Sequence, residues 1–184
     1  AKEKLEKTNA IRALDKAKLT YTVHTYENDG TAVDGVTVAQ KTGLPVEKVY
    51  KTLVTVGHSR EHYVFVIPVA AELDLKAAAR SVGEKSVEMI HVADINKLTG
   101  YIRGGCSPIG MKKQFVTVLD ESCLPLDTIV FSAGKIGMQI EMDPRALIDF
   151  IGAGLLPSQP GDLPLISKQP AGGHSLCRAV FAAA

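Results

Sequence analysis

The chain has 184 residues, of which 46% are apolar and 22% charged, and its formal net charge is +1. These values are typical of a soluble globular protein, and a domain of this length buries enough apolar surface to fold without disulfides or metals. The near-zero net charge excludes an overall basic footprint for nucleic acid, so any such contact depends on a local patch.

Helical and strand patterns are interspersed along the first 151 residues. Three helix starts carry a capping side chain, at Thr8, Asp74 and the Asp143-Pro144 pair, because an oxygen there accepts a hydrogen bond from a free backbone amide. Alternating or continuous β-branched and aromatic residues mark the strands. The predicted helices are residues 8–17, 36–42, 46–50, 75–81, 92–98 and 146–151, and the predicted strands are residues 21–26, 52–56, 62–69, 86–90, 114–119, 127–132 and 138–142.

The order of these elements has no regular strand–helix–strand rhythm, so a doubly wound parallel sheet is not favoured. We expect a mixed α/β fold with a partly curled sheet flanked by short helices, formed by residues 1–152. The composition changes after Gly152, because residues 153–184 hold four of the nine prolines. That segment is predicted to be a Pro/Gly-rich, poorly structured C-terminal extension.

A glycine loop, residues 99–113, follows the helix predicted over residues 92–98. It contains four glycines and a proline, and no acidic residue occurs between Asp94 and Asp120. Glycine lets backbone N–H groups approach a ligand closely, and such donors in a basic setting suit a carbonyl oxygen or a phosphate. The alternative is an ordinary turn that connects two elements.

Lys51 stands between a short predicted helix and an apolar strand, where a long cation can point into a cleft. An ammonium group there suits a carboxylate, a phosphate or a developing oxyanion. The alternative is a strand-edge lysine that extends into solvent. Other catalytic patterns are missing, since the sequence contains no GxSxG, HExxH, GxGxxG or Walker motif.

The three cysteines, Cys106, Cys123 and Cys177, are odd in number and widely spaced. Without a CxxC pair or zinc spacing, we expect no metal and no cofactor. Cys106 lies in the glycine loop without an obvious base beside it, so packing is favoured over nucleophilic catalysis. Unpaired cysteines, a charged N-terminal segment and the lack of an apolar run of about 20 residues predict a cytoplasmic protein with no membrane contact.

Several segments together resemble the YbaK/EbsC family, the free-standing relatives of the editing domain inserted in bacterial prolyl-tRNA synthetases. The most specific are Val49-Tyr-Lys-Thr-Leu53 and Gly104-Gly-Cys-Ser-Pro-Ile-Gly110. The others include His24-Thr-Tyr26, Thr99-Gly-Tyr101 and Ser132-Ala-Gly-Lys135. They run in family order over about residues 8–151, while the segment after Gly152 has no family match.

The resemblance implies a curled, barrel-like mixed β-sheet and hydrolysis of the ester that joins a wrong amino acid to tRNA, with Cys-tRNA(Pro) as the expected substrate. The implied partners are mischarged tRNA(Pro) and prolyl-tRNA synthetase. The implied mechanism uses the substrate's own thiol, which attacks its ester and leaves as a thiolactone. An intramolecular thiol needs no enzyme nucleophile, because proximity supplies a large effective molarity. Two alternatives stay open: a deacylase for another small amino acid such as alanine, and a non-catalytic module that binds tRNA or a nucleotide.

The resemblance also implies roles for individual residues. Three residues are implied to be catalytic because they occupy the matching positions of the family's motifs: Lys51, Gly104 and Gly105. The predicted substrate-binding residues are Tyr26, Thr52, Cys106, Ser107, Pro108, Ser132, Gly134 and Gln139. Several relatives have an aspartate where this chain has Gln139, so a role for that carboxylate does not transfer.

Overall fold

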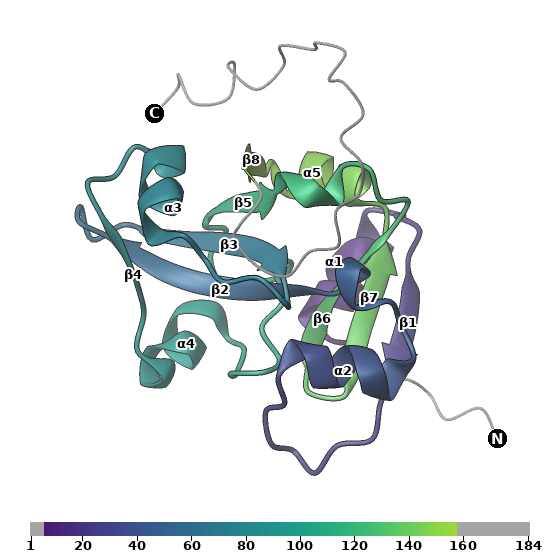
Figure 1. The fold of residues 1–184 in the computed structure, drawn as a ribbon. Coiled ribbons are helices and arrows are strands. Elements are labelled where there is room, and N and C mark those ends of the chain that lie inside the picture. The colour runs from purple at the N-terminus through teal and green to yellow at the C-terminus, as the bar shows by residue number, and fades with distance from the viewer. Residues whose placement is uncertain (1–5, 158–184) are drawn as a thin grey trace, which may run out of the picture.

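The computed structural model describes residues 6–157. Helices and strands alternate irregularly within that range (Figure 1). The elements are α1 (Asn9–Lys16), β1 (Thr22–Thr25), α2 (Gly35–Thr42), the 3-10 turn η1 (Val46–Lys48), β2 (Tyr50–Gly57), β3 (His62–Pro68), α3 (Leu75–Val82), β4 (Val87–Met89), α4 (Val92–Thr99), β5 (Val116–Asp120), the 3-10 turn η2 (Glu121–Cys123), β6 (Ile129–Lys135), β7 (Met138–Met142), α5 (Pro144–Ile151) and β8 (Gly154–Leu156).

The strands form two separate sheets. The smaller sheet has the order β1-β7-β6 and is antiparallel throughout. The larger has the order β4-β2-β3-β5-β8, in which β2 pairs antiparallel with β3 and β4 while the β3–β5 and β5–β8 pairs are parallel. A single parallel bridge joins Val49, just before β2, to Val130 in β6. The two sheets therefore meet where β2 begins (Figure 1).

The predicted mixed α/β class is confirmed, but the prediction of one curled, barrel-like sheet is wrong. A barrel closes only when its first and last strands pair. Here β4 and β8 are the edges of the larger sheet, and β1 and β6 are the edges of the smaller one. The barrel-like sheet was what the family resemblance implied, and strand patterns could not test it, because they show which side chains face inward but not which strands pair.

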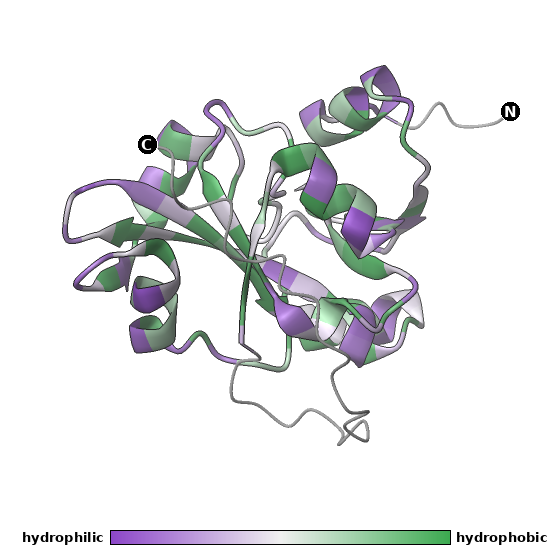
Figure 2. Cartoon of the chain, turned by 90° about the horizontal axis from the view of Figure 1, so that it is seen from above, coloured by the Kyte–Doolittle hydropathy of each residue, from purple (hydrophilic) through white to green (hydrophobic). Residues whose placement is uncertain are grey.

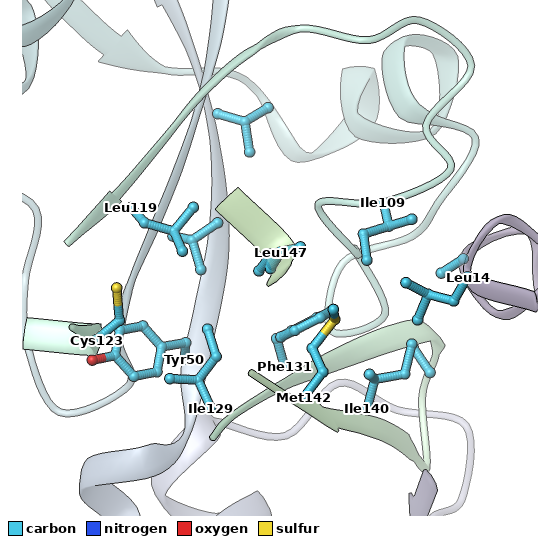
Figure 3. Close-up of a cluster of buried hydrophobic side chains, with 14 of the residues drawn as sticks. Leu14, Tyr50, Ile109, Leu119, Cys123, Ile129, Phe131, Ile140, Met142 and Leu147 are labelled. Carbon is cyan, nitrogen blue, oxygen red and sulfur yellow. The ribbon is translucent and has the colours of Figure 1, made fainter. Parts of the chain in front are cut away.

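The main core fills the space between the two sheets and helices α1 and α5. Its largest buried side chains come from distant segments and include Leu14, Phe131, Ile140 and Leu147 (Figure 3). Strand β3 is buried on both faces: Val64 and Val66 join this core, while Phe65 and Ile67 pack with α3 in a second cluster. Accordingly β3 lies in the interior of the five-stranded sheet.

Several helix predictions are confirmed at their caps. Thr8, Asp74 and Asp143 each accept a hydrogen bond from a backbone amide in the first turn of α1, α3 and α5. Gly43 and Gly83 end α2 and α3 with positive φ angles, a conformation that glycine adopts without strain. Figure 2 shows the hydropathy of each residue along the cartoon, with hydrophobic residues (green) in the central strands and hydrophilic residues (purple) on the helices around them.

Several boundaries differ from the sequence predictions, and two of these differences bear on the site and on the limits of the domain. Only residues 46–48 form a helical turn, and β2 begins at Tyr50, so Lys51 is part of the strand rather than a residue at a helix exit. Residues 154–156 form strand β8 beside β5, although a poorly structured extension was predicted from residue 153. A three-residue strand has too short a pattern to recognise, and residues 158–184 lie outside the described part.

Among residues 6–157, no helix is long and apolar enough to cross a membrane.

Candidate active site

A cavity of about 710 Å³ opens where the start of β2 meets α2, α4, the glycine loop and the smaller sheet. The cavity is lined by segments that are far apart in the sequence, because it lies between elements of both sheets. Its lining consists of residues 32–35, Val38, residues 49–54, Val69, Met89, Ile90, Val92, Ile95, Arg103, Gly104, Cys106, Ser132 and Gln139.

Lys51 is the half-buried cation of this cavity. Its Nζ atom lies 3.4 Å from the carbonyl oxygen of Val69. Burial lowers the pKa of the ammonium group, and the charge of Glu72 opposes that shift. An incompletely solvated ammonium group is a strong partner for a negative charge that forms beside it.

The glycine loop is held by close backbone packing. Gly104 has a φ of +83°, and a Cβ atom there would lie 2.7 Å from the Cβ atom of Ala32. A Cβ atom on Gly105 would lie 3.0 Å from the backbone nitrogen of Ile136 in the β6–β7 turn. The absence of side chains at both positions therefore lets the loop lie against two other segments.

The loop amides differ in their availability. Gly105 donates its N–H to the carbonyl oxygen of Ile102 at 3.0 Å. The N–H groups of Gly104 and Cys106 have no hydrogen-bond acceptor within residues 6–157, and both residues line the cavity. The N–H group of the predicted Gly105 is thus already used inside the protein, whereas those of Gly104 and Cys106 are not.

Two other predicted loop residues, Ser107 and Pro108, are buried and do not line the cavity. Ser107 is fully buried, and its Oγ accepts a hydrogen bond from the Ile109 backbone at 3.3 Å. Pro108 is also buried. Cys106 contributes to the lining, but burial raises the pKa of its thiol to about 11. This thiol stays protonated at neutral pH, which agrees with a packing role for its side chain.

Ser132 and Gln139 face each other across β6 and β7. Both line the cavity, and Gln139 is 5% exposed. The Ser132 hydroxyl accepts a hydrogen bond from the Gly134 amide at 3.2 Å. Gly134 itself packs against the ring of Tyr101, because a Cβ atom there would lie 2.6 Å from that ring. Gly134 thus shapes the strand rather than the cavity surface.

Two hydroxyl groups are buried without a hydrogen-bond partner in the described residues, those of Tyr26 and Thr52. Thr52 lines the cavity next to Lys51. Tyr26 is not part of the lining, and its ring lies below Lys41, with 6.0 Å from Nζ to the ring centroid.

The structure brings together a subset of the predicted site residues. Those that line the cavity are Lys51, Thr52, Gly104, Cys106, Ser132 and Gln139; those outside the lining are Tyr26, Gly105, Ser107, Pro108 and Gly134. Their roles remain predictions. Sequence reasoning missed the wall formed by β4 and α4, because the apolar residues Met89, Ile90, Val92 and Ile95 have the same pattern as core residues. Arg103 could have been predicted as a lining residue, because the glycine loop that contains it is basic.

The cavity contains no carboxylate or imidazole from residues 6–157 that is free to act as a base. The Asp34 carboxylate caps α2 by accepting from the Thr37 amide and hydroxyl, and the hydroxyl contact is the main reason its pKa is lowered. Tyr50 bonds to Ser122, and burial raises its pKa. Within the same range, no three His, Cys, Asp or Glu side chains gather to hold a metal ion.

The chain is thus a mixed α/β domain with an open cavity at the junction of its two sheets, and a half-buried lysine lies in that cavity. The chain belongs to the aminoacyl-tRNA editing domain family, whose model matches residues 31–150. The family resemblance inferred from the sequence is therefore confirmed.

Individual relatives agree with this assignment. The Enterococcus faecalis protein named "Putative Cys-tRNA(Pro)/Cys-tRNA(Cys) deacylase EbsC" is 46% identical over 147 residues, covering 80% of this chain and 90% of the relative. The crystal structure of "a putative trans-editing enzyme for prolyl tRNA synthetase" matches with a TM-score of 0.71 at 25% identity, covering 83% of this chain and 96% of the other. The hypothetical protein APE2540 shares the fold, with a TM-score of 0.74 at 22% identity over 83% of this chain and 99% of the other.

Proposed function

We propose that this chain deacylates mischarged Cys-tRNA(Pro) and leaves correctly charged tRNA intact. The observation that carries the proposal is the cavity itself, which combines the half-buried Lys51 with amides that have no acceptor but holds no free carboxylate or imidazole base and no ionised thiol among the described residues. Such a site suits a substrate that brings its own nucleophile. The name of the Enterococcus faecalis relative supports cysteine as the amino acid.

The reaction is an intramolecular acyl transfer. The cysteinyl thiol loses its proton to solvent, and its sulfur attacks the ester carbonyl carbon, forming a C–S bond. The bond between that carbon and the ribose oxygen then breaks, and the ribose oxygen takes up a proton. The products are tRNA and a cyclic thiolactone. Holding the thiol against the carbonyl supplies most of the acceleration, because the effective molarity of an oriented intramolecular group is large.

The protein stabilises the charge that develops during this attack. The amides of Gly104 and Cys106 donate to the carbonyl oxygen as it becomes an oxyanion, and the Lys51 ammonium group stabilises the same negative charge. Thr52 supplies a buried hydroxyl group with unsatisfied hydrogen-bonding capacity in the described residues, which favours a polar contact with the aminoacyl group. Cognate Pro-tRNA(Pro) is spared because proline has no thiol.

A deacylation panel tests the proposal. Purified protein is incubated with Cys-, Ser-, Ala- and Pro-tRNA(Pro), with and without prolyl-tRNA synthetase. We expect fast loss of cysteine and spontaneous rates for the other three. Cleavage of Ala-tRNA(Pro) as fast as Cys-tRNA(Pro) would assign the site to another small amino acid. Binding of tRNA without any cleavage would identify a non-catalytic module.

The proposed partners are tRNA(Pro) and prolyl-tRNA synthetase. The second partner is supported by the structurally similar protein described as a trans-editing enzyme for prolyl tRNA synthetase. Because only a few basic residues surround the cavity, we expect free tRNA to bind weakly and with strong salt dependence. Addition of the synthetase is then expected to lower the apparent KM.

A further inference from the structure

Tyr101 lies at the start of the glycine loop, and it does not line the cavity. Its side chain is 6% exposed. Burial is the main reason that the pKa of its phenol is raised to about 12, so the phenol stays protonated at neutral pH and keeps a proton to donate. A buried phenol of this kind requires hydrogen-bond partners, and its partners lie at the end of the glycine loop and in α1.

The Tyr101 hydroxyl group closes the base of the glycine loop. It donates a hydrogen bond to the carbonyl oxygen of Ile109 at 2.7 Å, and both residues are buried. Among residues 6–157, the only backbone–backbone hydrogen bond formed inside residues 102–109 joins Gly105 to Ile102. Side chains therefore hold this loop in place, and the phenol fixes the separation of its two ends.

The same hydroxyl group also holds the start of α1. The backbone N–H of Ala10 donates a hydrogen bond to the phenolic oxygen, which opposes part of the effect of burial on its pKa. Ala10 lies in the first turn of α1, where amide groups have no partner inside the helix. The cap residue Thr8 donates to the carbonyl oxygen of Ala133 in β6 at 2.5 Å. Tyr101 therefore joins the glycine loop to a helix that is itself attached to the smaller sheet.

Two glycines leave the space that the Tyr101 side chain occupies. A Cβ atom on Gly134 of β6 would lie 2.6 Å from a carbon atom of the ring. A Cβ atom on Gly110 would lie 2.9 Å from the phenolic oxygen. The side chain is thus confined on two sides, and this confinement keeps its hydroxyl group at one position.

The backbone of Tyr101 has a separate attachment to α4. Its N–H donates to the Thr99 hydroxyl group at 3.0 Å, and that hydroxyl donates in turn to the carbonyl oxygen of Ile95 at 2.7 Å. Thr99 is buried as well. The entry to the glycine loop is therefore fixed through its backbone and through its phenol, by two independent sets of hydrogen bonds.

We propose that Tyr101 is a positioning residue for the deacylation: by fixing the two ends of the glycine loop, it holds the Gly104 and Cys106 amides where the oxyanion forms. This inference rests on the proposed function, because it concerns the donors of the same reaction. Donors that are already in place stabilise charge without a reorganisation cost, and a displacement of about 1 Å can lower a rate about 100-fold. Tyr101 acts through the loop and touches no substrate, since it lies outside the cavity lining.

Hydrogen exchange of the Gly105 amide tests the attachment of the loop without any substrate. Tyr101→Phe keeps the ring against Gly134 and removes only the hydroxyl group. We expect the Gly105 amide to exchange about threefold to tenfold faster in this variant, as for one lost hydrogen bond, while amides in the centre of β3 change less. Tyr63→Phe is the matched control, because the Tyr63 hydroxyl donates to Glu84 at 2.8 Å and neither residue lines the cavity. It should leave Gly105 exchange unchanged.

Kinetics with Cys-tRNA(Pro) separate positioning from a merely structural role. We expect Tyr101→Phe to lower kcat about tenfold to 100-fold and to leave KM within about twofold, because donors to the oxyanion act in the transition state. The shape of the pH profile should not change, since the phenol transfers no proton in the reaction. A loss of stability alone would leave the kcat of the folded protein unchanged, and Tyr63→Phe should keep both constants.

The pair Thr99→Val and Thr99→Ser tests the same attachment if Tyr101→Phe does not fold. Valine removes the hydroxyl group that accepts from Tyr101, so Thr99→Val should lower kcat and accelerate Gly105 exchange, whereas Thr99→Ser should restore both; equal values for the pair overturn the proposal. Unchanged kcat or unchanged Gly105 exchange in folded Tyr101→Phe overturns it even if deacylation is confirmed. If the protein deacylates no substrate but Gly105 exchange accelerates as expected, Tyr101 holds the loop and only the proposed reaction fails.

Discussion

Gly105 donates its backbone N–H to the carbonyl oxygen of Ile102 at 3.0 Å. This bond closes the turn that contains Arg103 and Gly104, while the N–H groups of Gly104 and Cys106 have no acceptor within residues 6–157. The position of these donors therefore depends on how closely the turn packs against its neighbours. Packing is tightest at Gly104, where Ala32 leaves no room for a Cβ atom.

Gly104→Ala is expected to lower both turnover and stability. The new Cβ atom meets Ala32, and the φ of +83° strains any side chain, so the loop must move. We expect a loss of about 1–3 kcal/mol in the free energy of unfolding and a fall of at least about tenfold in deacylation rate. Gly30→Ala is the matched control, because Gly30 has a φ of +85° but nothing within 4 Å of its Cβ position. It should lose stability from strain alone and keep turnover.

Lys51→Met should separate catalysis from stability. Methionine keeps most of the length of the side chain and removes its charge, so we expect turnover to fall about 100-fold, as for the loss of one oxyanion donor. Burial lowers the pKa of Lys51, and so the unfolded chain binds a proton more readily at this position. The charged lysine therefore costs stability below its folded pKa, and the variant should gain up to about 1 kcal/mol at pH 7.

Urea unfolding and single-turnover deacylation measure these two effects. Lys85→Met, at an exposed position between α3 and β4, is the control and should change neither quantity. Equal losses of tRNA affinity and turnover in Lys51→Met would contradict the catalytic role and favour simple binding.

Cys106 should be slow to alkylate in the folded protein. Its pKa of about 11 leaves about one thiolate in a thousand at pH 8. A free cysteine, with a pKa near 8.5, is roughly 200 times more ionised at that pH. Mass spectrometry of iodoacetamide-treated native and urea-unfolded protein should show labelling of Cys106 accelerate on unfolding by about two orders of magnitude. Rapid native labelling would restore this thiol as a candidate nucleophile.

Local signals in the sequence predicted the elements and part of the site. Capping residues such as Thr8 and Asp143 act within one turn of the chain, and glycine stops do the same, so these helix ends were readable. Lys51 and Gly104 were found because their motifs are contiguous. Met89 and Val92 were missed because an apolar residue at a cavity mouth has the same local pattern as one in the core.

Long-range relationships were not readable in the same way. Pairing of β8 with β5 depends on a three-residue strand whose partners lie far back along the chain, at residues 118–120. The separation of the two sheets depends on which strand edges remain unpaired, and no local pattern records that. The hydrogen bond from the Gly105 amide to the Ile102 carbonyl oxygen was likewise not predictable, because a glycine in a motif does not reveal where its N–H group points.

A final prediction concerns the polar network on the outer side of the smaller sheet. Glu141 in β7 lies 2.8 Å from His24 Nε2 in β1 and accepts a hydrogen bond from the Thr128 hydroxyl group. Lys48 lies 3.9 Å from the same carboxylate and 2.7 Å from Asp127. These contacts join the smaller sheet to η1, immediately before the residues that line the cavity.

Loss of this carboxylate should destabilise the protein in a pH-dependent way. The Thr128 hydrogen bond is the largest cause of the lowered pKa of Glu141, followed by the His24 contact. Because the folded pKa is below the unfolded value of 4.5, the stabilisation is fully present above pH 4.5 and is lost as the pH falls through the folded pKa. Glu141→Gln should therefore lose about 1 kcal/mol at pH 7, and this difference from the unchanged protein should shrink below pH 4.5. Urea unfolding at several pH values measures it, with Glu88→Gln on the exposed edge strand β4 as the control. A difference that stays constant down to about pH 3 would show that the ionised carboxylate contributes nothing and that only the shape of the side chain matters.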